Sequence, residues 1–239
     1  MTTLFISDLH LDPSRPAVTR AFLDLLAGEA RSADALYILG DFFEVWIGDD
    51  DDAQLNQTVI TALKALTSSG TPVFVMHGNR DFLIGELFCQ QTGCQLIHDP
   101  STIELYGQPV LLLHGDTLCT DDIKYMEFRQ QCRSEAWQSA LLSHTVEQRR
   151  QLARQMRADS QAASSNKADD IMDVNQAEVL RMFAQHNVSL MIHGHTHRPA
   201  IHQHENNTLR VVLGDWHDSG WIIRYPSNGQ FKLEEFPIQ

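Results

Sequence analysis

The stretch that decides the fold is PVFVMHGNRDFL, residues 72–83. Its apolar run at 73–76 is short and unbroken, which is typical of a strand buried on both faces of a parallel sheet. The polar run HGNRD, residues 77–81, follows at once. Because sites in open α/β sheets lie outside the carboxyl ends of the strands, this order predicts a site just beyond a buried strand.

Short apolar runs alternate with helical patterns along the first third of the chain, and hairpin patterns follow, the last with the strong turn signal Asn228-Gly229. Residues 121 to about 187 lack strand signals and are predicted to be helical. The 239 residues fit one α/β domain, residues 1–239, with a helical insertion at 121–173. The predicted elements are strands at 4–7, 35–41 and 73–79, helices at 17–30, 56–70 and 82–93, and hairpins at 101–116, 198–215 and 219–236.

Composition narrows the class of protein. The formal net charge of −13 argues against a protein that wraps nucleic acid, which needs a basic surface. The four cysteines show no C-x-x-C spacing, as expected of reduced thiols in a cytosolic protein. The start, MTTLFISDLHL, is predicted to be a first strand and not a signal peptide. Because no apolar run approaches the roughly 18 residues of a membrane span, we expect a cytoplasmic protein, with peripheral membrane contact left open.

Potential metal ligands follow five apolar strands. Because such strand ends converge on one edge of an α/β sheet, we expect these side chains to meet there. Asp8 and His10 are two residues apart, as are His195 and His197, so each pair would face one side of an extended strand. The full set is Asp8, His10, Asp41, Asn79, His114, His195 and His197.

A single Asp or His at a strand end is more often a cap or a core hydrogen-bonding group, but five strand ends with one chemistry favour a metal site. His77 and His193 lie inside apolar strands, where a core role is expected, and Asp116 is expected to orient a ligand. Carboxylate, imidazole and amide ligands suit Mn²⁺, Mg²⁺, Zn²⁺ or Fe. Seven ligands fit two ions about 3.5–4 Å apart, bridged by one carboxylate. Two divalent ions keep a net positive charge after two acidic ligands are bound. This charge favours the binding of a hydroxide and a phosphate.

The order D-x-H, G-D, G-N, H-G-D and G-H-x-H resembles the calcineurin-like metallophosphoesterase pattern. The resemblance implies a β-sandwich flanked by helices with a dinuclear metal site, in which Asp41 bridges the ions. It assigns Asp8, His10 and His197 to one ion. It assigns Asn79, His114 and His195 to the other.

Arg80 stands where most of that superfamily has histidine. Arginine cannot supply a proton, because its pKa exceeds about 12, but it can clamp phosphate oxygens through two hydrogen bonds. A phosphate leaving group, unlike an alkoxide, needs no proton. Arg80 therefore indicates that the bond broken is a P–O–P link.

The longer motifs LGDFFEVWIGDDD, HGNRDFLIG, LLHGDTLCTDD, IMDVN and IHGHTHRPA resemble the UDP-2,3-diacylglucosamine hydrolase family over nearly the whole chain. The resemblance implies hydrolysis of UDP-2,3-diacylglucosamine to UMP and 2,3-diacylglucosamine 1-phosphate in lipid A biosynthesis, with two Mn²⁺, at the cytoplasmic face of the inner membrane. It implies Asp41, Arg80 and His195 as catalytic residues. Its substrate-lining residues would be Asn79, Arg80, Asp122, Ser160, Ser164, Lys167 and His195, with Ser165 or Asn166 as alternatives to Ser164.

The insertion at 121–173 is expected to be a lid that takes up acyl chains. Its basic residues, among them Arg149, Arg150, Arg154 and Arg157, are interleaved with apolar ones, which suits a surface helix on anionic lipid. The alternative is a helix whose apolar face packs on the core and whose arginines are solvated. The acidic run 49–52 is expected to be a solvated loop.

Two other classes of function stay open from the sequence alone. A phosphodiesterase or protein phosphatase on the same scaffold would be expected to keep histidine at position 80. A non-catalytic binding module would be expected to have lost ligands, whereas all seven are present here.

Overall fold

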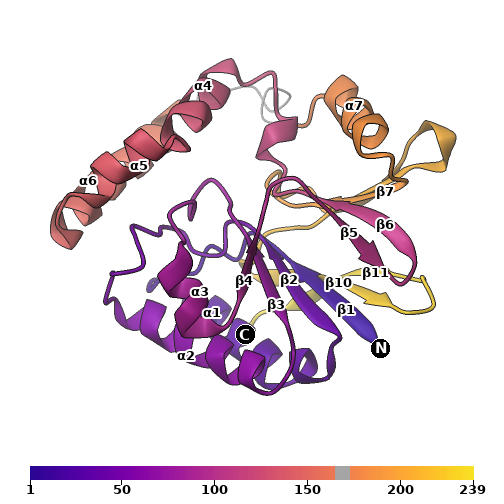
Figure 1. Ribbon diagram of the computed structural model, residues 1–239, viewed down its shortest axis with the longest axis horizontal. Helices are drawn as coiled ribbons and strands as arrows, with labels where there is room; N and C mark the ends of the chain where they lie inside the picture. The colour runs from indigo at the N-terminus through magenta and orange to yellow at the C-terminus, as the bar shows by residue number, and fades with distance from the viewer. Residues whose placement is uncertain (165–172) are drawn as a thin grey trace.

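The computed structural model describes residues 1–164 and 173–239, and it contains two β-sheets packed face to face (Figure 1). The first sheet has the order β11-β10-β1-β2-β3-β4, and the second has the order β5-β6-β7-β9-β8. The strands of the first are β1 (Thr2–Ile6), β2 (Ala35–Leu39), β3 (Val73–Met76), β4 (Gln95–Ile97), β10 (Ser219–Pro226) and β11 (Lys232–Pro237). Those of the second are β5 (Ser101–Leu105), β6 (Gln108–Leu112), β7 (Leu190–His193), β8 (Ala200–Gln203) and β9 (Leu209–Val212).

Helices cover the outer faces of both sheets (Figure 1). Helices α1, α2 and α3 pack on the first sheet, and α7 packs on the second. Helices α4, α5 and α6 lie between β6 and β7 in the chain and form an extension, here called the arm, residues 123–164. The bounds are α1 (Pro16–Ala27), α2 (Gln54–Ser68), α3 (Glu86–Thr92), α4 (Ile123–Cys132), α5 (Glu135–Leu142), α6 (Val146–Ser164) and α7 (Gln176–His186), with short 3₁₀ turns at Glu29–Ser32, Asp116–Leu118 and Glu205–Asn207.

The unbroken apolar strands have two buried faces because the sheet is covered on both sides. In β1, Leu4 and Ile6 pack with the helices, whereas Phe5 points into the core between the sheets. In β6, Leu111 packs toward α7 and Leu112 packs between the sheets. This alternation follows from the two-residue period of a strand, and it explains why the sequence shows continuous apolar runs.

The predicted strands and hairpins are present, and the parallel pairs β1–β2, β2–β3 and β6–β7 confirm the α/β class. Two expectations were wrong in detail, and one strand was not predicted. The third helix begins at Glu86, because residues 82–85 form a loop, and the short strand β4 carried no clear pattern. The ligand-bearing strands belong to two sheets and not to one open sheet edge.

Candidate dinuclear metal centre

All seven candidate ligands lie two to four residues beyond the ends of five strands, β1, β2, β3, β6 and β7. The first three are adjacent parallel strands of one sheet, and β6 and β7 are adjacent parallel strands of the other. Parallel neighbours end at the same edge, so each sheet delivers its ligands to one end of the sandwich. The site therefore spans the seam between the two sheets.

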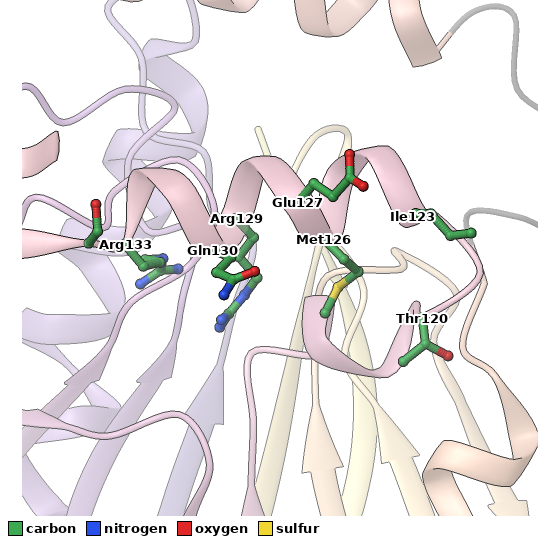
Figure 2. A pocket seen from close by; sticks show the side chains of 8 residues that line it. Thr120, Ile123, Met126, Glu127, Arg129, Gln130 and Arg133 are labelled. Carbon is green, nitrogen blue, oxygen red and sulfur yellow. The ribbon is translucent and has the colours of Figure 1, made fainter.

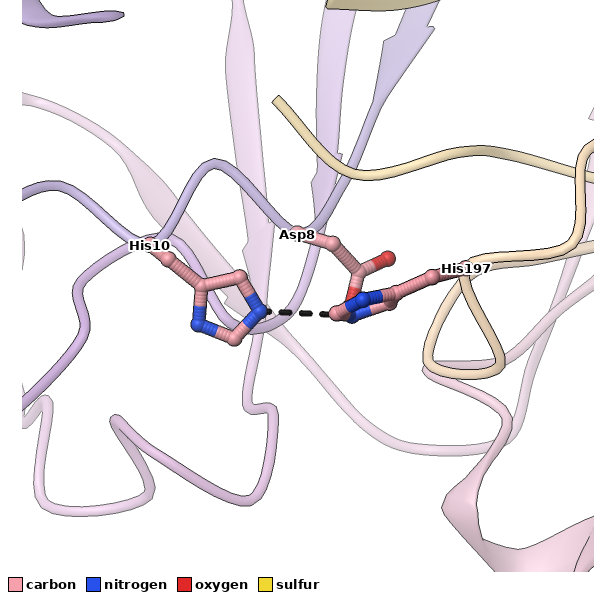
Figure 3. Close-up of side chains that lie close together, drawn as sticks. All are labelled: Asp8, His10 and His197. Carbon is pink, nitrogen blue, oxygen red and sulfur yellow. Dashed lines mark hydrogen bonds and ion pairs between the residues drawn. The ribbon is translucent and has the colours of Figure 1, made fainter. Parts of the chain in front are cut away.

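The first group of ligand atoms comes from Asp8, His10 and His197, and its members lie within 4.8 Å of one another (Figure 3). Nε2 of His10 is 3.3 Å from Nε2 of His197, which in turn is 3.4 Å from Oδ1 of Asp8. Three ligand atoms that face a common point at this spacing can hold one divalent ion.

The second group comes from Asp41, His114 and His195, again with ligand atoms within 4.8 Å. Oδ1 of Asn79 lies 3.0 Å from Nε2 of His114 and 3.0 Å from Nδ1 of His195, so the amide joins this group. Asp41 faces both groups: Oδ1 is 3.7 Å from Nε2 of His114, and Oδ2 is 3.7 Å from Nε2 of His10. A carboxylate with one oxygen toward each group is the arrangement of a bridging ligand.

The backbone at these ligands is in the left-handed region. The φ angles are 55° at Asp8, 48° at His10, 48° at Asp41, 66° at His195 and 54° at His197. The expectation that Asp8 and His10, or His195 and His197, share one side of an extended strand was therefore wrong. The chain leaves each strand and turns sharply, which sends His195 and His197 to different groups. Such residues cost on the order of 1–3 kcal/mol each and occur where the surrounding structure holds them for function.

Two glycines let the loops approach each other closely. A Cβ added at Gly78 would lie 2.1 Å from the backbone nitrogen of Asp41, and one at Gly194 would lie 2.1 Å from Oδ2 of Asp8. Neither neighbour can move, because each is a candidate ligand or its backbone. These positions admit only glycine without displacing the site.

Hydrogen bonds leave the ligand atoms free on the side of the metal groups. Oδ2 of Asp8 accepts from Ser7 Oγ at 2.6 Å and from the backbone N–H of His195 at 2.9 Å. Its Oδ1 is buried and has no hydrogen-bond partner among the described residues. Nδ1 of His114 lies 2.9 Å from the carbonyl oxygen of Leu39, so that nitrogen donates and Nε2 is left as the ligand. A buried carboxylate oxygen without a donor is what a cation would satisfy.

Asp81, which the sequence gave no role, fastens the loops that carry two ligands. Its Oδ1 accepts from the backbone of Gly78 at 2.7 Å, and its Oδ2 accepts from the backbone of Phe42 at 2.7 Å. Burial, and then the charge of nearby Asp41, raise the pKa of Asp81 to about 6. The only sequence signal for this role was its place directly after Asn79 and Arg80.

Asp116 belongs to neither group of ligand atoms. Its Oδ2 accepts from Tyr125 Oη at 2.5 Å and from Arg129 Nε at 2.7 Å, and the Tyr125 ring stacks on His195 with ring centroids 6.1 Å apart. Asp116 therefore acts through Tyr125, which supports the ring of His195. The sequence did not single out Tyr125 or Arg129 for this task.

A cavity of about 640 Å³ opens from the metal centre toward the arm. Among the expected substrate residues, Asn79, Arg80, Asp122, Ser160 and His195 line it. Lys167, Ser165, Asn166 and the side chain of Ser164 lie outside the described residues. The cavity wall away from the metal ligands is largely apolar and includes Trp46, Leu83, Phe128, Trp137, Leu141 and Met156.

Arg80 stands where the cavity meets the metal centre. Its backbone N–H donates to Oδ1 of Asp41 at 2.9 Å, and its buried Nε has no hydrogen-bond partner among the described residues. A buried guanidinium nitrogen without an acceptor costs free energy unless a ligand supplies one. The position fits a phosphate oxygen.

A second cavity, of about 700 Å³, lies along α4 and its flanks and does not include a candidate metal ligand (Figure 2). Thr120, Ile123, Met126 and Gln130 line it together with Arg129, whose guanidinium is paired with Asp99 and Asp116. No expected site residue contributes to this cavity.

The acidic run 49–52 is solvated only in part: Asp50 and Asp52 are exposed, as expected, whereas Asp51 is buried and Asp49 is half-buried. Oδ1 of Asp49 accepts from Trp46 Nε1 at 3.0 Å, and its Oδ2 accepts from the backbone N–H of Phe88 at 2.9 Å, in the first turn of α3. Asp50 forms a two-fold ion pair with Arg149, with N–O distances of 2.7 and 2.5 Å. The run joins α3 and the arm to the core.

The sequence suggested that the arginines of α6 are free surface cations, but in the structure they are paired. Arg149 is buried and also donates to the carbonyl oxygen of Ile47 at 2.6 Å. Arg150 pairs with Asp51 at 2.5 Å, and Arg157 pairs with Glu44 at 2.5 Å. Three of the four arginines expected to contact lipid instead fasten the arm to the core. No helix among the described residues is long and apolar enough to cross a bilayer.

Residues 1–199 match the family described as calcineurin-like phosphoesterase, and the chain belongs to that family. Two solved structures share the fold over almost the whole chain at 13% identity. One is an archaeal phosphodiesterase, with a TM-score of 0.53 over 99% of this chain and 100% of that one. The other is a dimetal phosphatase from Danio rerio, with a TM-score of 0.51 over 100% of this chain and 98% of that one.

Much more similar relatives are named UDP-2,3-diacylglucosamine hydrolase. The relative from Cellvibrio japonicus is 53% identical over 96% of this chain and 97% of its own length. Those from Pseudomonas fluorescens (strain Pf0-1) and Enterobacter sp. (strain 638) are each 50% identical, over 98% and 100% of this chain and 95% and 100% of their own. The chain is thus a hydrolase of this family with a dinuclear metal centre.

Proposed function

We propose that this enzyme hydrolyses the pyrophosphate bond of UDP-2,3-diacylglucosamine to give UMP and 2,3-diacylglucosamine 1-phosphate, a step of lipid A biosynthesis. The observation that carries the proposal is the cavity that joins a metal centre and Arg80 at one end to apolar walls at the other. A diphosphate with a lipid attached has the same two-part character. The full-length similarity to relatives named for this substrate supports the assignment.

Asp8, His10 and His197 would hold one ion, and Asn79, His114 and His195 the other, with Asp41 between them. We propose Mn²⁺, since a mixed carboxylate, imidazole and amide shell suits it, and Mg²⁺, Zn²⁺ or Fe are the alternatives. When bound, a metal pair lowers the pKa of water and offsets charge on phosphoryl oxygens. Asp41 fixes the spacing of the two sites, because its oxygens lie 3.7 Å from a ligand nitrogen in each group.

Arg80 would bind the diphosphate and stabilise charge as the P–O–P link breaks. Its main chain is anchored on Asp41, and its side chain lines the cavity beside the metal centre. Because arginine keeps its proton, the leaving group must depart unprotonated, as a phosphate can. Attack on the phosphorus nearest uridine then releases 2,3-diacylglucosamine 1-phosphate.

The other proposed substrate contacts divide between core and arm. His195 and Asn79 come from the sandwich, while Asp122 directly precedes the arm and Ser160 lies in α6, and both line the same cavity. Asp122 also caps α4, since its side chain accepts from the backbone N–H of Tyr125 at 3.2 Å. We include Lys167 and Ser164 as further substrate residues on the family resemblance alone.

We further propose that the arm acts as a lid over the acyl chains and that the enzyme works at the cytoplasmic face of the inner membrane. The arm supplies Phe128, Trp137, Leu141 and Met156 to the cavity wall. The arm also exposes part of three other apolar side chains that a lipid surface could accept, namely Ile123, Leu142 and Leu152.

Product analysis tests the reaction. The purified protein with Mn²⁺ should convert UDP-2,3-diacylglucosamine to UMP and 2,3-diacylglucosamine 1-phosphate, and should turn over p-nitrophenyl phosphate far more slowly. Faster turnover of the aryl phosphate would instead favour a general phosphatase on this scaffold.

A further inference from the structure

Glu44 stands between the metal centre and the arm. It lies in the loop after β2, three residues beyond Asp41. Its Oε2 is 2.9 Å from Nδ1 of His10, and its Oε1 is 2.5 Å from Nε of Arg157 on α6. One carboxylate thus contacts a candidate metal ligand with one oxygen and the arm with the other.

Nδ1 of His10 is buried and has no aligned hydrogen bond among the described residues, and the Glu44 carboxylate lies 2.9 Å from it. Nε2 faces the other ligands, 3.3 Å from His197 and 3.7 Å from Asp41. A carboxylate beside Nδ1 keeps the proton on that nitrogen and leaves the lone pair of Nε2 for a metal ion. It also fixes the rotation of the ring, while the backbone N–H of His10 is held by the carbonyl oxygen of Asp41 at 2.9 Å.

The contact with Arg157 attaches α6 to the sandwich. Arg149 and Arg150 bind the acidic run after β2, and Arg157 is about two helical turns further along. Arg154 differs, since it pairs with Glu147 of its own helix. Among the described arginines of α6, Arg157 is therefore the one whose partner also contacts a metal ligand.

We propose that Glu44 is a positioning residue that orients His10 for metal binding and anchors α6 through Arg157, so that closure of the arm and loading of the Asp8–His10–His197 site stabilise each other. Coupling of this kind is reciprocal: whatever holds the arm down also holds Glu44 against His10. The inference rests on the proposed function through the metal centre only, and it does not depend on which phosphoanhydride is cleaved.

The test compares Glu44→Ala, Glu44→Gln and the control Glu147→Ala in the full-length protein after removal of metal with a chelator. Mn²⁺ is titrated and followed by electron paramagnetic resonance, which distinguishes a coupled pair of ions from a single one. Amide hydrogen exchange of α6 is measured in parallel. Neither readout needs substrate, so a parent enzyme that binds two Mn²⁺ but does not cleave UDP-2,3-diacylglucosamine would overturn the proposed reaction and leave this inference standing.

Glu44→Ala should weaken Mn²⁺ binding at one of the two sites by about 10–100-fold, the usual effect of losing a partner of a metal ligand. Glu44→Gln should recover most of that affinity, because its amide oxygen can still accept from Nδ1 of His10. Both variants should show faster exchange in α6, since a side-chain amide in that orientation cannot also accept from Arg157. Glu147→Ala should match the parent in Mn²⁺ binding.

The recovery by glutamine in one readout and not in the other is not expected of a residue that only fills space. Parent-like Mn²⁺ binding by Glu44→Ala, or unchanged exchange in α6, would refute the shared role. Equal loss of Mn²⁺ affinity in Glu44→Ala and Glu44→Gln would refute the orientation of His10 by this contact.

Discussion

The metal centre and the arm hold their functional residues in opposite ways. At the metal centre, Asp8, Asp41 and His114 are almost fully buried, and five of the seven ligands have positive φ. In the arm, α4 and α6 together bury only Cys132 and Arg149 among the described side chains, and α5 buries none. The described arm residues meet the sandwich through ion pairs and through half-buried apolar side chains such as Leu141 and Trp137.

The difference matches what each region has to do. Metal ligands must be held within a fraction of an ångström, and a packed core with backbone strain achieves that. A segment with few buried apolar contacts opens more readily than the core. This attachment of the arm therefore suits a cover that admits a long lipid, whereas the centre beneath it stays fixed.

The largest expected effect is at the centre. Asp41→Ala or His114→Ala should lower turnover of UDP-2,3-diacylglucosamine with Mn²⁺ by more than about 1,000-fold, since loss of a ligand exceeds the roughly 10–100-fold cost of losing a ligand's partner. Circular dichroism should show a folded protein in each case. The control is Asp218→Ala, at a fully exposed carboxylate. Near-parental turnover by either variant would contradict the dinuclear assignment.

Arg80 comes next, at the boundary between centre and cavity. Arg80→Ala should lower kcat by about 100–1,000-fold, as for other fixed donors to transition-state charge. Arg80→Lys should recover only part of this, because an ammonium group cannot make the paired contact of a guanidinium. The exposed Arg20→Ala serves as the control. Full activity of Arg80→Lys would show that a point charge is sufficient.

The arm attachment should have a smaller effect on chemistry and a clear effect on motion. Arg149→Ala removes the ion pair with Asp50 and the bond to Ile47, so amide exchange in α6 should quicken while turnover falls only a few-fold. Arg154→Ala, at an arginine paired within its own helix, should change exchange far less. Equal effects of the two substitutions would argue against a specific attachment at Arg149.

The smallest effect concerns the outer surface of the arm. The double variant Leu142→Asn, Leu152→Asn should weaken binding to anionic vesicles but leave turnover of detergent-dispersed substrate near the parental rate, because both side chains are exposed. Leu180→Asn, at a similarly exposed leucine of α7, is the matched control. If the double variant binds vesicles as the parent does, these two leucines do not contribute to membrane binding.

The sequence predicts the strands and the ligand-bearing loops well, because apolar runs that end in Asp, His or Asn are a local pattern. It does not predict the conformation of those loops. The positive φ of His195 and His197 depends on contacts from other strands, such as the bond from the backbone of His195 to Asp8. The periodic pattern of a short sequence segment carries no information about a contact with a distant segment.

The arm shows the same limit at longer range. The arginines of α6 and the acidic run after β2 are about one hundred residues apart, so a charge pattern read along the chain gives each a solvated or lipid-facing role. Folding brings Arg149 to Asp50 and Arg157 to Glu44. These charges therefore form ion pairs within the fold, whereas the sequence pattern favoured contact with a membrane.

The most direct test of the proposed reaction is hydrolysis of UDP-2,3-diacylglucosamine by the Mn²⁺-loaded enzyme in ¹⁸O-labelled water, with both products analysed by mass spectrometry. If water attacks the phosphorus nearest uridine and Arg80 stabilises a phosphate leaving group, the label appears in UMP, and 2,3-diacylglucosamine 1-phosphate is unlabelled. Label in the 2,3-diacylglucosamine 1-phosphate would contradict the direction of attack and the role given to Arg80.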